Sequence, residues 1–147
     1  MLLLPDQPSG SVEAGKLMDE IDTIRQRKME DLKKELEKRE YPAEPLEVTD
    51  AAFDEFTARH TLVVVDCWAQ WCGPCRMLSP VIDELATDLR GKVIFGKLNV
   101  DHNKGTAMRF AISSIPSLLV FKDGKLADRI IGAVPKQKII QRLQPLM

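Results

Sequence analysis

Two cysteines, Cys72 and Cys75, stand two residues apart directly after an apolar segment, and no other feature of the sequence constrains the fold as strongly. The segment Thr61–Val65 is rich in β-branched residues, which is typical of a buried strand. The residues after Cys75 have a helical pattern. We therefore predict a strand that leads into a helix whose start carries two thiols. Such a pair can close and reopen a disulfide, so it can carry two electrons.

Length and composition limit the classes of protein to consider. The 147 residues are enough for one ordinary domain, and 44% apolar with 29% charged residues is typical of a soluble globular protein. A net charge of −1 provides no basic field for a nucleic acid or a membrane surface. The apolar run Met1–Leu4 is too short for a signal peptide, and no segment approaches the roughly 20 apolar residues of a membrane span. We therefore expect a cytoplasmic protein, with neither nucleic acid nor membrane as a partner, in which a dithiol is catalytic rather than structural.

The first 45 residues differ in composition from the rest of the chain. Residues 1–12 contain proline, glycine and serine and predict a flexible start. Residues 13–40 are highly charged and predict a helix with a thin apolar stripe, which Tyr41–Pro45 ends as a proline linker. Three roles stay open for this helix: a solvated helix, docking to a partner, and association with a second copy.

Residues 46–147 alternate strand and helix patterns and predict a separate domain. Thr49 or Asp50 is a candidate N-cap for a short helix that runs to Arg59. Strands are expected at 61–67, 92–100, 117–121 and 125–131, and helices at 74–89, 103–110 and 136–146. Asp123-Gly124 predicts a hairpin turn. This order predicts an α/β domain with a mixed sheet covered by helices on both faces.

The position of the dithiol at a helix start suggests which cysteine attacks. Only a thiolate attacks a disulfide, and the start of a helix favours negative charge, so Cys72 is the predicted nucleophile. Cys75 is then the resolving thiol, and Pro74 suits the first helical turn. A zinc site is the rival interpretation, but it usually needs four ligands. The remaining candidates stand at no standard spacing, so we expect no metal: Cys67, His60 and His102.

Several motifs occur together in a specific order: Asp66-Cys67-Trp68-Ala69, Trp71-Cys72-Gly73-Pro74-Cys75, Lys97-Leu98-Asn99-Val100-Asp101, Ile115-Pro116 and Gly132-Ala133. On these motifs, residues 46–147 resemble the thioredoxin family. The resemblance implies the thioredoxin fold and reduction of protein disulfides by dithiol exchange through a Cys72–Cys75 redox disulfide. It also implies disulfide-containing substrate proteins as partners. Because the sequence has no dinucleotide fingerprint, the chain is expected to hold no cofactor and to receive electrons from a separate reductase.

The resemblance also implies roles for individual residues. Asp66 would exchange a proton with Cys75, and Lys97 would modulate it. Pro116 would form a cis peptide bond that holds the Ile115 backbone beside Cys72, where an extended substrate segment could pair. The surface that binds substrate would consist of Trp71, Gly73, Pro74, Ile115, Pro116, Gly132 and Ala133. Cys67 departs from the family pattern, and we expect a small buried residue there, with a regulatory thiol as the alternative.

Two other functions stay open at this point. The Gly73-Pro74 pair resembles strongly reducing family members and disfavours the first alternative, a glutaredoxin-like or isomerase-like activity. The second alternative is an interaction module in which the helix at 13–40 recruits a partner and the dithiol is incidental. Replacement of Cys72 by serine would separate an enzyme from such a module.

Overall fold

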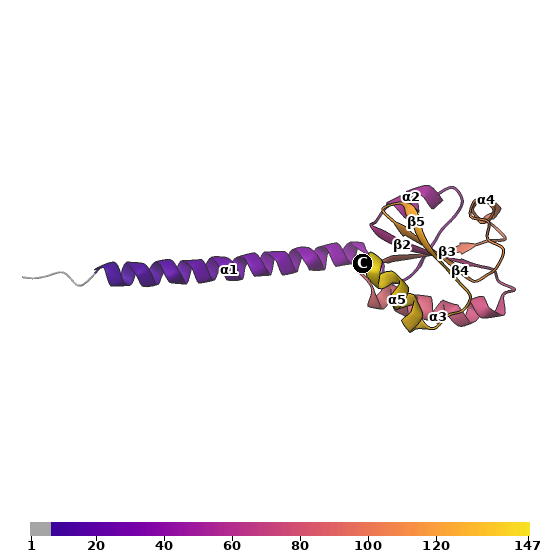
Figure 1. Cartoon of the computed structure of the whole chain (residues 1–147). Helices are drawn as coiled ribbons and strands as arrows, with labels where there is room; N and C mark the ends of the chain where they lie inside the picture. Colours follow the sequence, from indigo (N-terminus) through magenta and orange to yellow (C-terminus); the bar gives the residue numbers. More distant parts are fainter. Residues whose placement is uncertain (1–6) are drawn as a thin grey trace, which may run out of the picture. The chain divides into compact units, whose positions relative to one another are not determined.

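The computed structural model describes residues 7–147, and it describes only the backbone of residues 7–12 and 37–39. The chain divides into two units, residues 1–37 and 38–147. The first unit consists of most of helix α1, which spans Gln7–Glu40 (Figure 1). The helix ends directly before Tyr41-Pro42, as predicted, and it already includes residues 7–12, for which the sequence predicted a flexible start. Helix α1 is too polar to cross a membrane, and no other helix within residues 7–147 is long and apolar enough to do so.

The second unit is built on a five-stranded sheet with the order β1-β3-β2-β4-β5. Strands β1, β3 and β2 run parallel to one another. Strand β4 runs antiparallel to β2, and β5 runs antiparallel to β4, so the sheet is mixed, as predicted. Strand β1 has only two residues, and such a segment is too short to show the period of a strand in a sequence. The strands are β1 (Leu46–Glu47), β2 (Leu62–Trp68), β3 (Ile94–Asn99), β4 (Ser117–Lys122) and β5 (Lys125–Ile131).

Helices cover both faces of this sheet (Figure 1). Helices α3 (Gly73–Asp88) and α5 (Lys136–Leu143) pack on one face, and α2 (Phe53–Ala58) and α4 (Lys104–Arg109) lie over the other. The chain ends in a short 3₁₀ helix, Gln144–Leu146. Side chains of β2 alternate between the two cores: Leu62 and Val64 pack with α3 and α5, whereas Val63 and Val65 pack on the opposite side. Both faces of this central strand are buried, which explains why it appears in the sequence as a continuous apolar run.

Asp50 caps a different helix from the one that the sequence predicted. Helix α2 has Ala52 at its N-cap position, without a side-chain hydrogen bond, so the prediction of Thr49 or Asp50 as its cap was wrong. The Asp50 carboxylate instead accepts hydrogen bonds from the backbone N–H groups of Gly105 (3.1 Å) and Thr106 (2.9 Å) in α4. These bonds satisfy N–H groups at the start of α4 that lack partners within the helix. They also hold the pKa of Asp50 below its ordinary value, with the Thr106 hydroxyl as the strongest donor.

The segment Tyr41–Pro45 between α1 and β1, predicted as a proline linker, is attached to the rest of the second unit by specific contacts. The Tyr41 carbonyl oxygen accepts a hydrogen bond of 2.8 Å from Arg90 Nε, and its ring packs against the ring of His60. The Thr87 hydroxyl donates to the Ala43 carbonyl oxygen at 3.0 Å. Residues 41–43 are therefore held against the end of α3 and its following turn.

Candidate active site

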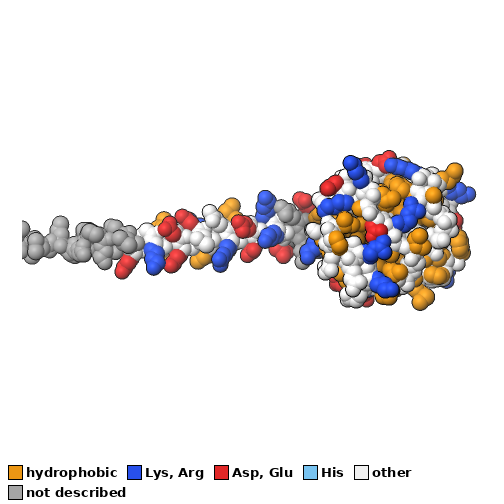
Figure 2. Space-filling model, viewed as in Figure 1, with side chains coloured by type: hydrophobic (Ala, Val, Ile, Leu, Met, Phe, Trp, Pro, Cys, Tyr) orange, Lys and Arg blue, Asp and Glu red, His pale blue; other side chains and the backbone are white. Residues whose placement is uncertain are grey.

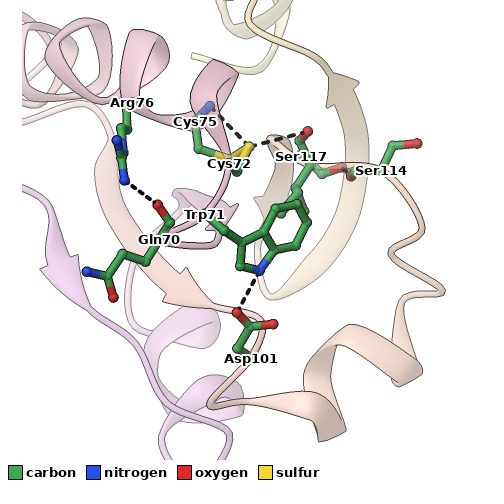
Figure 3. Close-up of a disulfide and its surroundings, with 9 residues drawn as sticks. Gln70, Trp71, Cys72, Cys75, Arg76, Asp101, Ser114 and Ser117 are labelled. Carbon is green, nitrogen blue, oxygen red and sulfur yellow. Dashed lines mark hydrogen bonds between the residues drawn. A yellow bond between two sulfur atoms is a disulfide. The ribbon is translucent and has the colours of Figure 1, made fainter.

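Cys72 and Cys75 form a disulfide at the start of helix α3, with their Cα atoms 5.3 Å apart (Figure 3). Cys72 has extended backbone angles and is the N-cap residue of the helix. Its Sγ accepts a hydrogen bond of 3.2 Å from the backbone N–H of Cys75. Pro74 occupies the first turn, where its missing N–H removes no helical hydrogen bond. A thiolate at Cys72 would thus meet an N–H donor and the positive end of the helix dipole.

A bent segment before β4 faces this disulfide. The Ile115–Pro116 peptide bond is cis, as the resemblance implies. The Ile115 carbonyl oxygen lies 3.8 Å from Cys72 Sγ. Gly132, just after β5, donates its N–H to the Pro116 carbonyl oxygen at 2.8 Å and has a φ of +93°, a conformation that glycine adopts without strain. The structure therefore brings the Ile115 backbone to Cys72 Sγ and holds Gly132 against the neighbouring Pro116.

The surface beside the disulfide includes an exposed aromatic ring. The side chain of Trp71 is 70% exposed, and its indole N–H donates to Asp101 Oδ2 at 2.9 Å (Figure 3). Gly73 is exposed as well, and an added Cβ there would meet no atom within 4 Å. Ala133 is exposed next to Gly132. Trp71 and Gly73, the two neighbours of Cys72 in the chain, are therefore both accessible. Sequence reasoning missed Asp101 as the partner that orients Trp71.

A cavity of about 120 Å³ lies on the other side of the dithiol, and both Asp66 and Cys75 line it. Asp66 is only 2% exposed, and its Oδ1 has no hydrogen-bond partner among the described residues. Burial raises the pKa of this carboxyl to about 7, because an ion loses its hydration there. The remaining lining residues are Trp68, Arg76, Ser79 and Lys97.

Lys97 lies beside Asp66, because the two residues are register partners on the parallel strands β3 and β2. Its ammonium group donates to Ser79 Oγ at 2.6 Å and forms an ion pair with Asp83 at 3.4 Å. The Lys97 charge lowers the pKa of Asp66 and the Asp83 charge raises it, and both effects are smaller than that of burial.

Ser79 and Asp83 are the residues near the site that sequence reasoning missed. Their spacing of four residues places them on one face of a helix, but nothing local predicts that this face meets Lys97.

The third cysteine lies apart from this chemistry. Cys67 is a free, fully buried thiol that packs with Val63 and Val65, in the core on the opposite side of the sheet from α3. Burial raises the pKa of its thiol to about 12. This environment matches the small buried residue that the sequence predicted. Among the side chains that the structure describes, no group of three or more histidine, cysteine or acidic residues is arranged to hold a metal ion.

The arrangement of groups around the Cys72–Cys75 disulfide indicates which reaction the site can carry out. A disulfide at a helix start has a protonatable carboxyl behind it and the Ile115 backbone carbonyl in front of it. Such a site can exchange its disulfide with that of an extended peptide lying on the surface. On the fold described above, these features define a thiol–disulfide oxidoreductase with two active cysteines.

Comparison with known proteins agrees with this class. A sequence model of the thioredoxin family matches residues 44–145. Thioredoxin 2 of Chlorobaculum tepidum is 50% identical over 98 residues, which are 66% of this chain and 90% of that protein. The thioredoxin of Synechocystis is 48% identical over 99 residues, 67% of this chain and 92% of that protein. The solved structure of a mutant thioredoxin from Halobacterium salinarum superposes with a TM-score of 0.67 at 30% identity, covering 71% of this chain and 92% of that one.

The chain therefore belongs to the thioredoxin family. It is a protein disulfide reductase that works by dithiol–disulfide exchange through Cys72 and Cys75. Its family implies disulfide-containing substrate proteins and a reductase of the thioredoxin type. The matched region begins at residue 44, so these relationships do not explain helix α1.

Proposed function

We propose that Cys72 is the attacking sulfur and Cys75 the resolving one. In the reduced protein, the Cys72 thiolate attacks one sulfur of a substrate disulfide, forms a mixed disulfide and releases the other substrate sulfur as a thiolate, which takes up a proton. Cys75 then attacks Cys72 Sγ, so the Cys72–Cys75 disulfide closes and the second substrate thiol leaves. Two electrons pass from the dithiol to the substrate. The hydrogen bond from the Cys75 N–H to Cys72 Sγ supports this order, because it stabilises negative charge on Cys72.

We propose Asp66 as the group that takes the proton from the Cys75 thiol. The two residues line the same cavity, and a carboxyl with a pKa of about 7 can both accept and return a proton near neutral pH. Lys97 is proposed to tune this exchange, since its positive charge favours the ionised form of Asp66.

The substrate is proposed to bind as an extended segment along Ile115. The cis bond at Pro116 leaves the Ile115 carbonyl oxygen 3.8 Å from Cys72 Sγ, where backbone pairing can hold a substrate cysteine in place. Trp71, Gly73 and Pro74 on one side and Gly132 and Ala133 on the other are proposed to contact it. Main-chain pairing depends little on side-chain identity, so many substrate proteins can be accepted.

Reduction of insulin disulfides tests this assignment. The wild-type protein, first reduced with a dithiol, should precipitate the insulin B chain, and Cys72→Ser should not. Cys75→Ser should accumulate a mixed disulfide with insulin that a reductant releases, whereas Cys67→Ser, the matched control in the opposite core, should retain activity. A Cys72→Ser variant that still reduces insulin would refute the assignment of the nucleophile and would favour a role for the chain as an interaction module.

The first 45 residues and the cellular setting complete the proposal. We propose that residues 46–147 carry the redox activity and that residues 1–45 are a separate segment, whose helix α1 binds a partner or a second copy. The exposed apolar side chains of this helix support that role. The cytoplasm is the proposed compartment, because a reducing environment keeps the dithiol available. Activity of a chain shortened to residues 46–147 and fractionation of the source cells would test the two statements.

A further inference from the structure

Helix α1 carries a thin apolar stripe whose positions repeat along the helix. The positions of Met18, Ile21 and Arg25 repeat 11 residues later, where Met29, Leu32 and Leu36 stand. An 11-residue repeat corresponds to about 3.67 residues per turn, close to that of a straight helix, so the stripe stays on one face. Its apolar members, apart from the half-buried Ile21, are each more than half exposed. The stripe therefore presents a continuous seam for another helix, interrupted only by the charge of Arg25.

The charges of the helix are arranged antisymmetrically about a point between Thr23 and Ile24. Each residue of the first half has a counterpart at the same distance beyond this point. Five of these pairs join opposite charges: Glu13 with Lys34, Lys16 with Asp31, Asp19 with Lys28, Glu20 with Arg27, and Asp22 with Arg25. Between residues 13 and 34, only Glu30 and Lys33 lack a charged counterpart, and Met18 corresponds to Met29. Figure 2 shows the charged and apolar side chains side by side along the helix.

We propose that a second copy of this chain is the partner of helix α1 and that the two helices pair antiparallel, centred between Thr23 and Ile24. This inference deepens the role proposed above for the N-terminal segment and does not involve the redox site. In an antiparallel pair, the acidic stretch 19–22 of one copy lies beside the basic stretch 25–28 of the other, twice by symmetry. In a parallel pair in register, like charges would lie side by side, which is destabilising.

The pair of Asp22 and Arg25 lies closest to the seam. Arg25 falls within the stripe, four residues after Ile21 and four before Met29, and Asp22 stands one turn earlier at its edge. Among the described side chains, no ion pair involves a residue of α1, so both groups are available. Antiparallel pairing gives each Arg25 a carboxylate from the other copy. The other four pairs lie farther around the helix, on its flanks or on the face away from the stripe, so they contribute less to the pairing than Asp22 and Arg25.

The two redox units of the proposed pair are attached at its opposite ends. The centre of the pair lies more than 16 residues before the end of α1 at Glu40, which is about 25 Å at 1.5 Å per residue. The two units that follow α1 therefore begin at opposite ends of the pair, about 50 Å apart along its axis.

Charge reversal at the seam tests the proposal on the full chain. Sedimentation equilibrium should show dimers of the wild-type protein, and Arg25→Asp or Asp22→Arg alone should raise the dissociation constant at least about tenfold. The double variant Asp22→Arg/Arg25→Asp should restore dimers, since it exchanges the two charges. Lys34→Asp, a matched charge reversal on the opposite side of the helix, should change the constant less than about threefold. A monomeric wild-type protein, or a double variant no better than the singles, would overturn the proposal.

The orientation is tested by a distance between the two copies. Spin labels on Lys34→Cys, attached to the oxidised protein while Cys67 is buried, should be about 35–40 Å apart in the antiparallel pair. A separation under about 25 Å would indicate parallel helices and refute the proposed register. Insulin reduction by every variant should match wild type, which separates a failure of the dimer from a failure of the redox assignment.

Discussion

The buried carboxyl of Asp66 should make the stability of the protein fall as the pH rises. Its pKa in the folded protein is about 7, against 3.8 for the unperturbed group, because burial disfavours the charge. Between these two values the folded protein holds a proton that the unfolded chain has lost. Raising the pH through this range therefore favours the unfolded chain, and above about pH 8 the penalty is complete.

The size of the effect follows from the two pKa values. Their difference corresponds to about 4 kcal/mol in the free energy of unfolding, since one pKa unit is worth about 1.36 kcal/mol. This is a large share of the roughly 5–15 kcal/mol that stabilises an ordinary domain. The orphaned Oδ1 of Asp66 is consistent with such a cost, because no hydrogen bond compensates for the lost hydration of this atom.

The measurement compares wild type with Asp66→Asn by urea unfolding of the oxidised protein from pH 4 to pH 9. The wild type should lose about 4 kcal/mol relative to the variant between pH 4 and pH 8, with a slope near 1.4 kcal/mol per pH unit at the middle of the range. Burying the asparagine amide changes the free energy of unfolding by an amount that does not depend on pH. Comparing the slopes of the two curves removes this constant difference. If the two proteins show parallel curves, Asp66 is ionised in the folded state at acidic pH, and the argument from burial fails.

Three further predictions concern the surroundings of the site and the sheet. Lys97→Met should raise the pKa of Asp66 above that of wild type, because a neighbouring positive charge is lost, whereas Asp83→Asn should lower it. Infrared titration of the carboxyl checks both, and shifts in the same direction would contradict the electrostatic account. Gly96→Ala should destabilise the protein by about 2 kcal/mol in urea unfolding, since its Cβ would lie 2.5 Å from a methyl group of Val48. An unchanged urea midpoint would contradict this prediction, because it would mean that Val48 moves aside without a loss of stability.

Much of the fold was accessible from the sequence because its signals are local. The apolar run at β2, the Asp123-Gly124 turn and the proline after Glu40 each specify the conformation of their own segment. Alternating strand and helix segments then restrict the topology to a mixed sheet with helices on both faces. The dithiol could also be predicted from the sequence, because the spacing of the two cysteines within one helical turn is itself a local feature.

Other contacts were decided by the tertiary structure, because they depend on how distant segments align. Only the register of β2 against β3 places Lys97 beside Asp66, and only the packing of α3 on that face brings in Asp83. In the same way, Asp50 caps α4, which lies more than 50 residues away in the sequence. A local pattern specifies which residues can be buried or capped. The partners of a buried charge are fixed by the packing of whole elements, so the chemistry of Asp66 could be derived only from the folded chain.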